Sequence, residues 1–141
     1  MLNITKVWAV FFSATGTTRK VVTAVARTIA ARLDVEWDTF DFTLPASRQA
    51  ALSFSATDLA VFGTPVYAGR VPNILLNYLE TVQGNGALAV PVVLFGNRSY
   101  DDALIELRDI LETDGFHTVA AAAFVGEHAF SYALGAGRPD D

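Results

Sequence analysis

The chain has 141 residues, of which 52% are hydrophobic and 18% are charged, and its formal net charge is −5 at pH 7. This size and apolar content predict a single domain over residues 1–141 with a sizeable core, and they exclude a disordered chain. No apolar run is long enough to span a membrane, and no basic stripe with interleaved aromatic residues indicates nucleic-acid binding. Cysteine is absent, which excludes disulfides, thiolate nucleophiles and cysteine metal clusters, and a cytoplasmic location fits this composition.

The first half of the chain alternates strand and helix patterns. A continuous apolar run over 6–12 predicts a strand buried on both faces, and an amphipathic helix over 18–33 follows it. The spacing of apolar residues predicts the buried side of that helix: Val22, Val25, Ile29 and Leu33. A second strand over 35–42, a short helix over 45–52 and a third strand over 59–62 complete this half.

The second half continues the alternation. A helix that begins at Pro72, a favourable first helical position, is predicted to bury one side: Ile74, Leu75, Tyr78, Leu79 and Val82. A fourth strand over 89–95 precedes a helix that begins near Ser99 or Asp101 and ends at Gly115. A fifth strand over 118–125 comes last. Strands that alternate with helices predict an α/β fold with a parallel sheet and right-handed crossovers.

The segment over 126–141 has too little periodicity for a full closing helix, so one face of the last strand is expected to lack its cover. Three explanations stay open. Residues 129–134 form a short substitute, or the chain is part of a longer protein, or a partner covers this surface. The last explanation includes a homodimer through the uncovered strand.

Three loops are expected to meet at one edge of this sheet, because ligands of open parallel sheets bind beyond the carboxyl ends of the strands. The loop from Ser13 to Thr18 is rich in hydroxyl groups, lacks carboxylates and precedes a helix, which suits a phosphate. Such turns also cap helices without any ligand. The loops after the third and fourth strands contribute Tyr67 and Tyr100, and tyrosines flanked by glycine suit a flat ring. Phosphate and ring together predict flavin mononucleotide (FMN).

These loops resemble those of a known family. Ser13-x-Thr15-Gly16-x-Thr18 is similar to the phosphate loop of flavodoxins, and Gly96-Asn97-Arg98-Ser99-Tyr100 resembles their third flavin loop. Tyr67 falls where many flavodoxins have the other flanking aromatic residue. The resemblance covers nearly the whole chain. In finer detail, 11–16, 65–72 and 96–104 resemble the flavodoxin-like half of bacterial ferredoxin–flavodoxin fusion proteins.

The resemblance implies a doubly wound, five-stranded parallel sheet of order 2-1-3-4-5, with a short or missing last helix. It also implies an FMN-binding electron carrier whose partners are redox proteins, among them an iron–sulfur protein or domain. No catalytic or metal-binding residue is expected. The residues expected to bind FMN are Ser13, Ala14, Thr15, Gly16, Thr17, Thr18, Thr64, Pro65, Val66, Tyr67, Ala68, Gly69, Gly96, Asn97 and Tyr100.

One position departs from the family. Flavodoxins commonly have glycine directly after the first flanking aromatic residue, where this chain has Ala68. The resemblance implies that a peptide here rotates when the flavin N5 gains a proton. Alanine makes a positive φ costlier than glycine does, so whether that rotation takes place is left open.

The same residues bear on three other functions. A response-regulator receiver needs an acidic pair after the first strand and an acceptor aspartate after the third, and Phe12-Ser13 and Gly63-Thr64 stand there instead. Glu127 and His128 would point to opposite faces of a strand and have no third ligand, so they do not indicate a metal site. A flavodoxin-like scaffold without flavin, acting through protein contacts, stays open. The acidic residues that concentrate after Glu80 would steer docking onto a basic partner.

Overall fold

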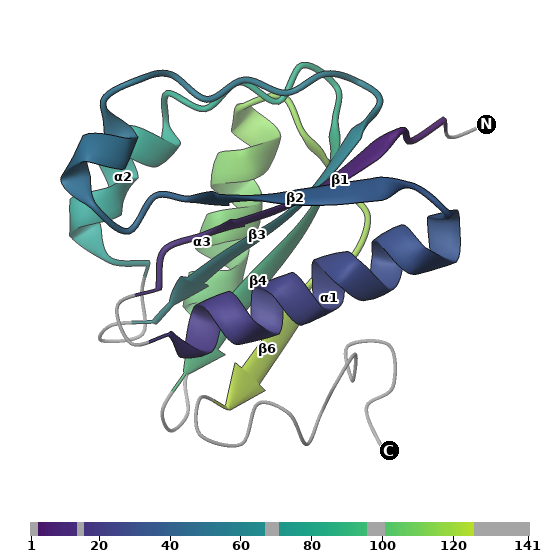
Figure 1. The fold of residues 1–141 in the computed structure, drawn as a ribbon. Helices are drawn as coiled ribbons and strands as arrows, with labels where there is room; N and C mark the ends of the chain where they lie inside the picture. The colour runs from purple at the N-terminus through teal and green to yellow at the C-terminus, as the bar shows by residue number, and fades with distance from the viewer. Residues whose placement is uncertain (1–2, 14–15, 67–70, 96–100, 126–141) are drawn as a thin grey trace.

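A computed structural model describes residues 3–13, 16–66, 71–95 and 101–125 (Figure 1). All strand pairs in these residues are parallel, and the strands follow the order β2-β1-β3-β4-β5, with β6 also paired to β4. The strands are β1 (Lys6–Phe11), β2 (Glu36–Asp41), β3 (Asp58–Pro65), β4 (Leu88–Phe95), β5 (His117–Thr118) and β6 (Ala122–Val125). The predicted α/β fold and its 2-1-3-4-5 order are confirmed, with the fifth predicted strand present as two pieces.

Helices cover both faces of the sheet (Figure 1). They are α1 (Thr17–Leu33), the short 3-10 helix η1 (Pro45–Arg48), α2 (Asn73–Leu79) and α3 (Asp101–Thr113). Alternate residues of β1 point to opposite faces, so Val7 and Phe11 pack with α1 while Val10 packs with α2 and α3. A helix over 45–52 was predicted, and only its first four residues are helical.

Two predicted core residues are exposed. Leu33 is 45% exposed because it is the last residue of α1, before the left-handed turn at Asp34. Ile74 is 67% exposed because α2 buries a narrow stripe that contains Leu75 and Tyr78, and Ile74 lies about 100° around the helix from Leu75. The predictions that Leu33 and Ile74 belong to the core are therefore wrong.

The fifth predicted strand is interrupted because of a proline in β4. The N–H of Val119 donates to the carbonyl oxygen of Ala89 at 3.0 Å, which shows that the backbone polar groups of Ala89 face the fifth strand. The backbone of Pro91, two residues further along β4, faces the same strand, but proline has no N–H to donate. Pairing stops after Ala89 and Thr118 and resumes at Val92 and Ala122. Residues 119–121, between β5 and β6, therefore lie opposite only residues 90–91 of β4. The proline thus produces a bulge.

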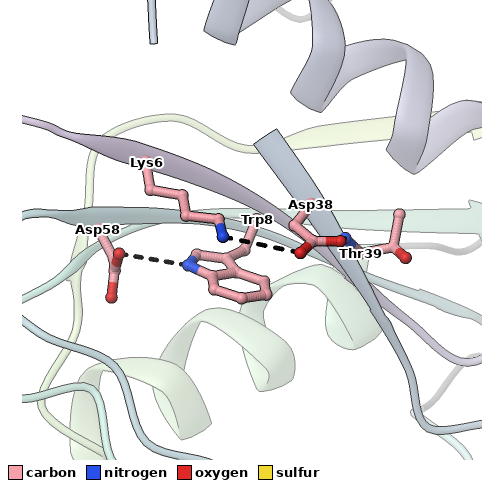
Figure 2. A network of polar contacts seen from close by, with 5 residues as sticks. All are labelled: Lys6, Trp8, Asp38, Thr39 and Asp58. Carbon is pink, nitrogen blue, oxygen red and sulfur yellow. Dashed lines mark hydrogen bonds and ion pairs between the residues drawn. The ribbon is translucent and has the colours of Figure 1, made fainter. Parts of the chain in front are cut away.

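Trp8 joins the three strands at the β2 side of the sheet. Its indole N–H donates to Asp58 Oδ1 at 3.2 Å, and the Nζ of Lys6 lies 4.3 Å from its ring centroid (Figure 2). Lys6 Nζ also lies 3.6 Å from Asp38 Oδ2. The Trp8 ring also packs in a T-shaped arrangement against Phe54. Trp8 is therefore a packing residue.

Candidate functional site

The carboxyl ends of β1 and β3 lie side by side. Phe11 pairs with Gly63, and the N–H of Phe12 donates to the Gly63 carbonyl oxygen at 3.1 Å. The next strand joins them through Val66, whose N–H donates to the Leu94 carbonyl oxygen at 2.9 Å. The structure therefore brings the residues after β1 to the same edge as the end of β3, as predicted.

The predicted FMN site falls partly within the described residues. The structure describes these residues of the predicted site: Ser13, Gly16, Thr17, Thr18, Thr64, Pro65 and Val66. The others lie outside the described residues, and their roles stay predictions: Ala14, Thr15, Tyr67, Ala68, Gly69, Gly96, Asn97 and Tyr100.

Ser13 caps the start of α1. Its Oγ accepts hydrogen bonds from the N–H groups of Gly16 at 3.1 Å and Arg19 at 2.9 Å. Gly16 is the N-cap residue and has φ 93°, a left-handed conformation that glycine adopts without strain. A Cβ built on Gly16 would meet nothing within 4 Å, so this turn opens to free space. Ser13 and Gly16 therefore form a helix cap with an open side.

The first turn of α1 favours an anion. It contains no acidic residue, and the N–H groups of Thr17 and Thr18 belong to the turn that has no acceptors within a helix. The positive end of the helix dipole adds to this preference. Thr18 is only 3% exposed, so its side chain packs within the protein.

Sequence reasoning missed a support for Ser13. The N–H of Ser13 donates to Thr43 Oγ1 at 2.9 Å, and the Thr43 hydroxyl donates in turn to Asp41 Oδ1. The same carboxylate oxygen accepts the N–H of Thr43 at 2.9 Å. These contacts fix the start of the loop to the end of β2. The sequence carried a signal only for the turn between Asp41 and Thr43, because an aspartate two residues before a threonine favours such a turn.

Replacing Thr43 tests this support. Thr43→Val keeps the shape of the side chain but removes the acceptor of the Ser13 N–H, so we expect the free energy of unfolding to fall by about 1 kcal/mol. Urea denaturation measures the change. Thr39→Val, at an exposed threonine of β2, is the matched control and should change stability by less than about 0.5 kcal/mol. Equal effects of the two variants would contradict the assignment.

The end of β3 lies very close to α1. A Cβ built on Gly63 would lie 2.1 Å from Val22 Cγ2 and 3.3 Å from Thr18 Cγ2. Glycine is therefore required at this position for α1 to pack against the sheet. Directly after it, Thr64 is 1% exposed and its hydroxyl donates to the Pro65 carbonyl oxygen at 3.1 Å. Its side chain therefore serves the local backbone turn.

A carboxyl with a shifted pKa lies at the opposite edge of the sheet. Burial, with a further contribution from Glu80, raises the pKa of Asp114 to about 7. Its Oδ2 has no hydrogen-bond partner among the described residues, and its carbonyl oxygen accepts the N–H of Gly84 at 2.8 Å. This turn precedes β4, so Asp114 lies at the amino edge. Shifted pKa values often mark active sites, but here the position indicates a cost to stability.

The shifted pKa predicts a pH dependence of stability. Because the folded-state pKa lies above its ordinary value of 3.8, the stability that protonation gives is complete below about pH 4 and is lost as pH rises to about 7. Asp114→Asn should raise the free energy of unfolding at pH 8 by about 1–2 kcal/mol, allowing for solvent screening, and flatten this profile. Urea denaturation at pH 4.5 and pH 8 checks it. If Asp114→Asn kept the wild-type profile, or if the exposed Glu112→Gln flattened it equally, the assignment would be wrong.

Two kinds of site receive no support in the described residues. Nowhere in 3–13, 16–66, 71–95 and 101–125 do three or more histidine, aspartate or glutamate side chains gather as metal ligands would. Within the same ranges, no helix is long and apolar enough to cross a membrane.

The parallel sheet with strand order 2-1-3-4-5 defines a flavodoxin-like fold, and solved structures share it. A flavodoxin from Streptococcus pneumoniae matches with a TM-score of 0.62 and 19% identity, covering 85% of this chain and 83% of its own. A short-chain flavodoxin associated with a bacterial microcompartment matches with a TM-score of 0.58 and 18% identity, covering 100% of both chains. A Fusobacterium nucleatum flavodoxin variant bound to FMN gives 0.57 and 17%, covering 83% and 69%. No protein-family model and no curated protein sequence matches the chain.

Proposed function

We propose that this chain is an FMN-binding electron-transfer protein. The observation that carries the proposal is the junction between Ser13 and α1, where an open, left-handed Gly16 precedes a helix start without carboxylates. The fold match to flavodoxins, one of them bound to FMN, supports it. A cytoplasmic location and redox partner proteins, among them an iron–sulfur protein or domain, remain predictions within the same proposal.

The described residues fit the phosphate end of FMN. The backbone N–H groups of Thr17 and Thr18 and the hydroxyl of Thr17 are donors at the positive end of α1. Ser13 orients the first turn through its two accepted hydrogen bonds. Tyr67 and Tyr100, which lie outside the described residues, are proposed to flank the ring. Bound FMN would supply the reversible uptake and release of electrons, and the protein would bind and orient it and limit the access of water.

A flavin-free scaffold is the second candidate. It is favoured by one observation: Ser13 Oγ already satisfies the N–H groups of Gly16 and Arg19, so these two donors need no phosphate. The two candidates make different predictions for FMN binding, and a charge placed in the first turn of α1 separates them.

Thr17→Asp is the most selective variant for this purpose. A carboxylate in the first helical turn favours the helix dipole, so the fold should be as stable as the wild type or more so. The same charge repels a phosphate, and we expect FMN affinity to fall by about tenfold to a hundredfold at low salt. Riboflavin, which has no phosphate, should bind both proteins equally. Flavin fluorescence titrations measure all four affinities.

Thr17→Asn is the matched control, because it has nearly the same shape without the charge. It should keep FMN affinity within about threefold of the wild type. If Thr17→Asp bound FMN as well as Thr17→Asn does, the phosphate would not lie at the start of α1. If the wild type bound neither FMN nor riboflavin, the scaffold candidate would replace the carrier.

A further inference from the structure

The outer side of α1 carries charge of a single sign. This helix contains four basic residues and no acidic one, although the protein as a whole has a net charge of −5. All four side chains are exposed, and none has an ion-pair partner among the described residues: Arg19, Lys20, Arg27 and Arg32. We call this surface the α1 basic stripe.

The opposite face of the sheet has the reverse charge. The sequence of α3 contains five acidic residues and one basic residue, Arg108, which pairs with Asp109 at 3.0 Å. Figure 1 shows α1 and α3 on opposite sides of the sheet. The protein is therefore electrically polarised across its sheet, and the excess acid of the chain does not neutralise the α1 basic stripe.

Helix stability alone does not account for this arrangement. Arg19 and Lys20 lie near the start of α1, where the helix dipole favours acidic side chains, so basic ones there cost stability. A phosphate bound at the start of the helix would offset that cost for these two residues. It would not reach Arg27, which lies about 10 Å further along the helix than Lys20. Arg32 differs from the other three, because it lies in the last turn, where the helix dipole favours a basic side chain. Arg19, Lys20 and Arg27, which helix stability does not explain, together match a larger anionic surface.

We propose that the α1 basic stripe docks an acidic electron-transfer protein. The kind of partner rests on the proposed function, and the location rests on the charges. Docking here places the partner beside the loop between Ser13 and α1, at the carboxyl edge of the sheet. Complementary charge of this kind steers association and fixes orientation.

Two other anionic surfaces fit less well. The apolar side of α1, including Val22 and Val25, is buried against the sheet, so the helix has no apolar face to insert into a bilayer. Carboxylates also bound the stripe: Asp34 follows the end of α1, and Asp41 ends the neighbouring β2. A uniformly anionic nucleic acid would meet these carboxylates, whereas a folded acidic protein can present both signs.

The probe for the test is a plant-type [2Fe–2S] ferredoxin, an acidic electron-transfer protein. Backbone amide shifts of the whole chain, recorded with and without ferredoxin at about 20 mM salt, should change along α1 and recover at about 200 mM salt. Arg27→Glu should weaken the measured affinity by about three- to tenfold at the lower salt. Arg108→Glu makes the same change of charge on the opposite face and should alter affinity by less than about twofold.

FMN affinity, measured on the same samples, separates this inference from the proposed function. Normal FMN binding with no shifts along α1 would overturn the docking site and leave the carrier proposal intact. Shifts along α1 without FMN binding would support the docking site and reject the carrier. Equal weakening by Arg27→Glu and Arg108→Glu, or shifts confined to α3, would overturn the inference. The inference would also be overturned if the protein bound a DNA duplex or anionic phosphatidylserine vesicles through α1 more tightly than it binds ferredoxin.

Discussion

Gly63→Ala should reduce the free energy of unfolding by about 2–3 kcal/mol, as overpacking in a dense core does. The added Cβ would lie 2.1 Å from Val22 Cγ2, far inside van der Waals contact. Val22 cannot readily turn away, because valine has one strongly preferred rotamer in a helix and this side chain is fully buried. The strain must therefore move α1 away from β3. Urea denaturation gives the change in stability.

A second substitution shows whether that collision is the cause. Val22→Ala removes the nearest atom, and the closest remaining contact of the new Cβ would be Thr18 Cγ2 at 3.3 Å. Val22→Ala alone leaves a small cavity and should cost about 2 kcal/mol. The double variant should be more stable than the sum of the single effects predicts, by about 1–2 kcal/mol. Additive effects would show that β3 and α1 are not in contact at Gly63.

The two loop tyrosines should have the largest effect on FMN binding. Tyr67→Ala and Tyr100→Ala each remove one aromatic face from the proposed ring site. Stacking of a flat base on an aromatic side chain contributes about 1–3 kcal/mol, so each variant should lose roughly tenfold to a hundredfold in FMN affinity. Flavin fluorescence quenching measures the affinity.

The phenylalanine variants are the controls for this pair. Tyr67→Phe and Tyr100→Phe keep the ring and should bind FMN within about threefold of the wild type, since stacking uses the ring face rather than the hydroxyl. Riboflavin should lose affinity in the alanine variants as much as FMN does, in contrast to Thr17→Asp. If both alanine variants bound FMN with wild-type affinity, the aromatic sandwich would be wrong.

The parallel α/β sheet could be predicted because it depends on features that are local in the sequence, whereas the strand order 2-1-3-4-5 was implied by the resemblance to flavodoxins. Apolar runs of strand length alternate with amphipathic segments, and right-handed crossovers then restrict the possible arrangements. The position of the helix cap at Ser13 and Gly16 was predictable for the same reason, since a strand directly precedes it and a helix directly follows.

Contacts between distant segments could not be predicted in this way. Ser13 and Thr43 are 30 residues apart, and only the pairing of β1 with β2 brings them together. The packing at Gly63 is of the same kind, because the sequence shows a glycine at the end of a strand but not that Val22 lies against it.

The errors have physical causes as well. Helix periodicity describes the middle of a helix better than its ends, which is why Leu33 was assigned to the core although it is exposed. Ile74 was assigned to the core because the predicted buried face of α2 was wider than the observed one. The interruption between β5 and β6 had a signal in the sequence, since Pro91 stands within an apolar strand. A proline in β4 removes a hydrogen bond to either β3 or the fifth strand, depending on which of them its backbone faces. The sequence does not show which strand Pro91 faces, whereas the register of β4 does.

Titration of the wild-type chain with FMN tests the central claim most directly. Purified protein at micromolar concentration should quench flavin fluorescence with one FMN per chain, and it should bind riboflavin more weakly, because the start of α1 favours the phosphate. No quenching at micromolar protein would contradict the claim and would leave the flavodoxin-like fold as a scaffold without flavin.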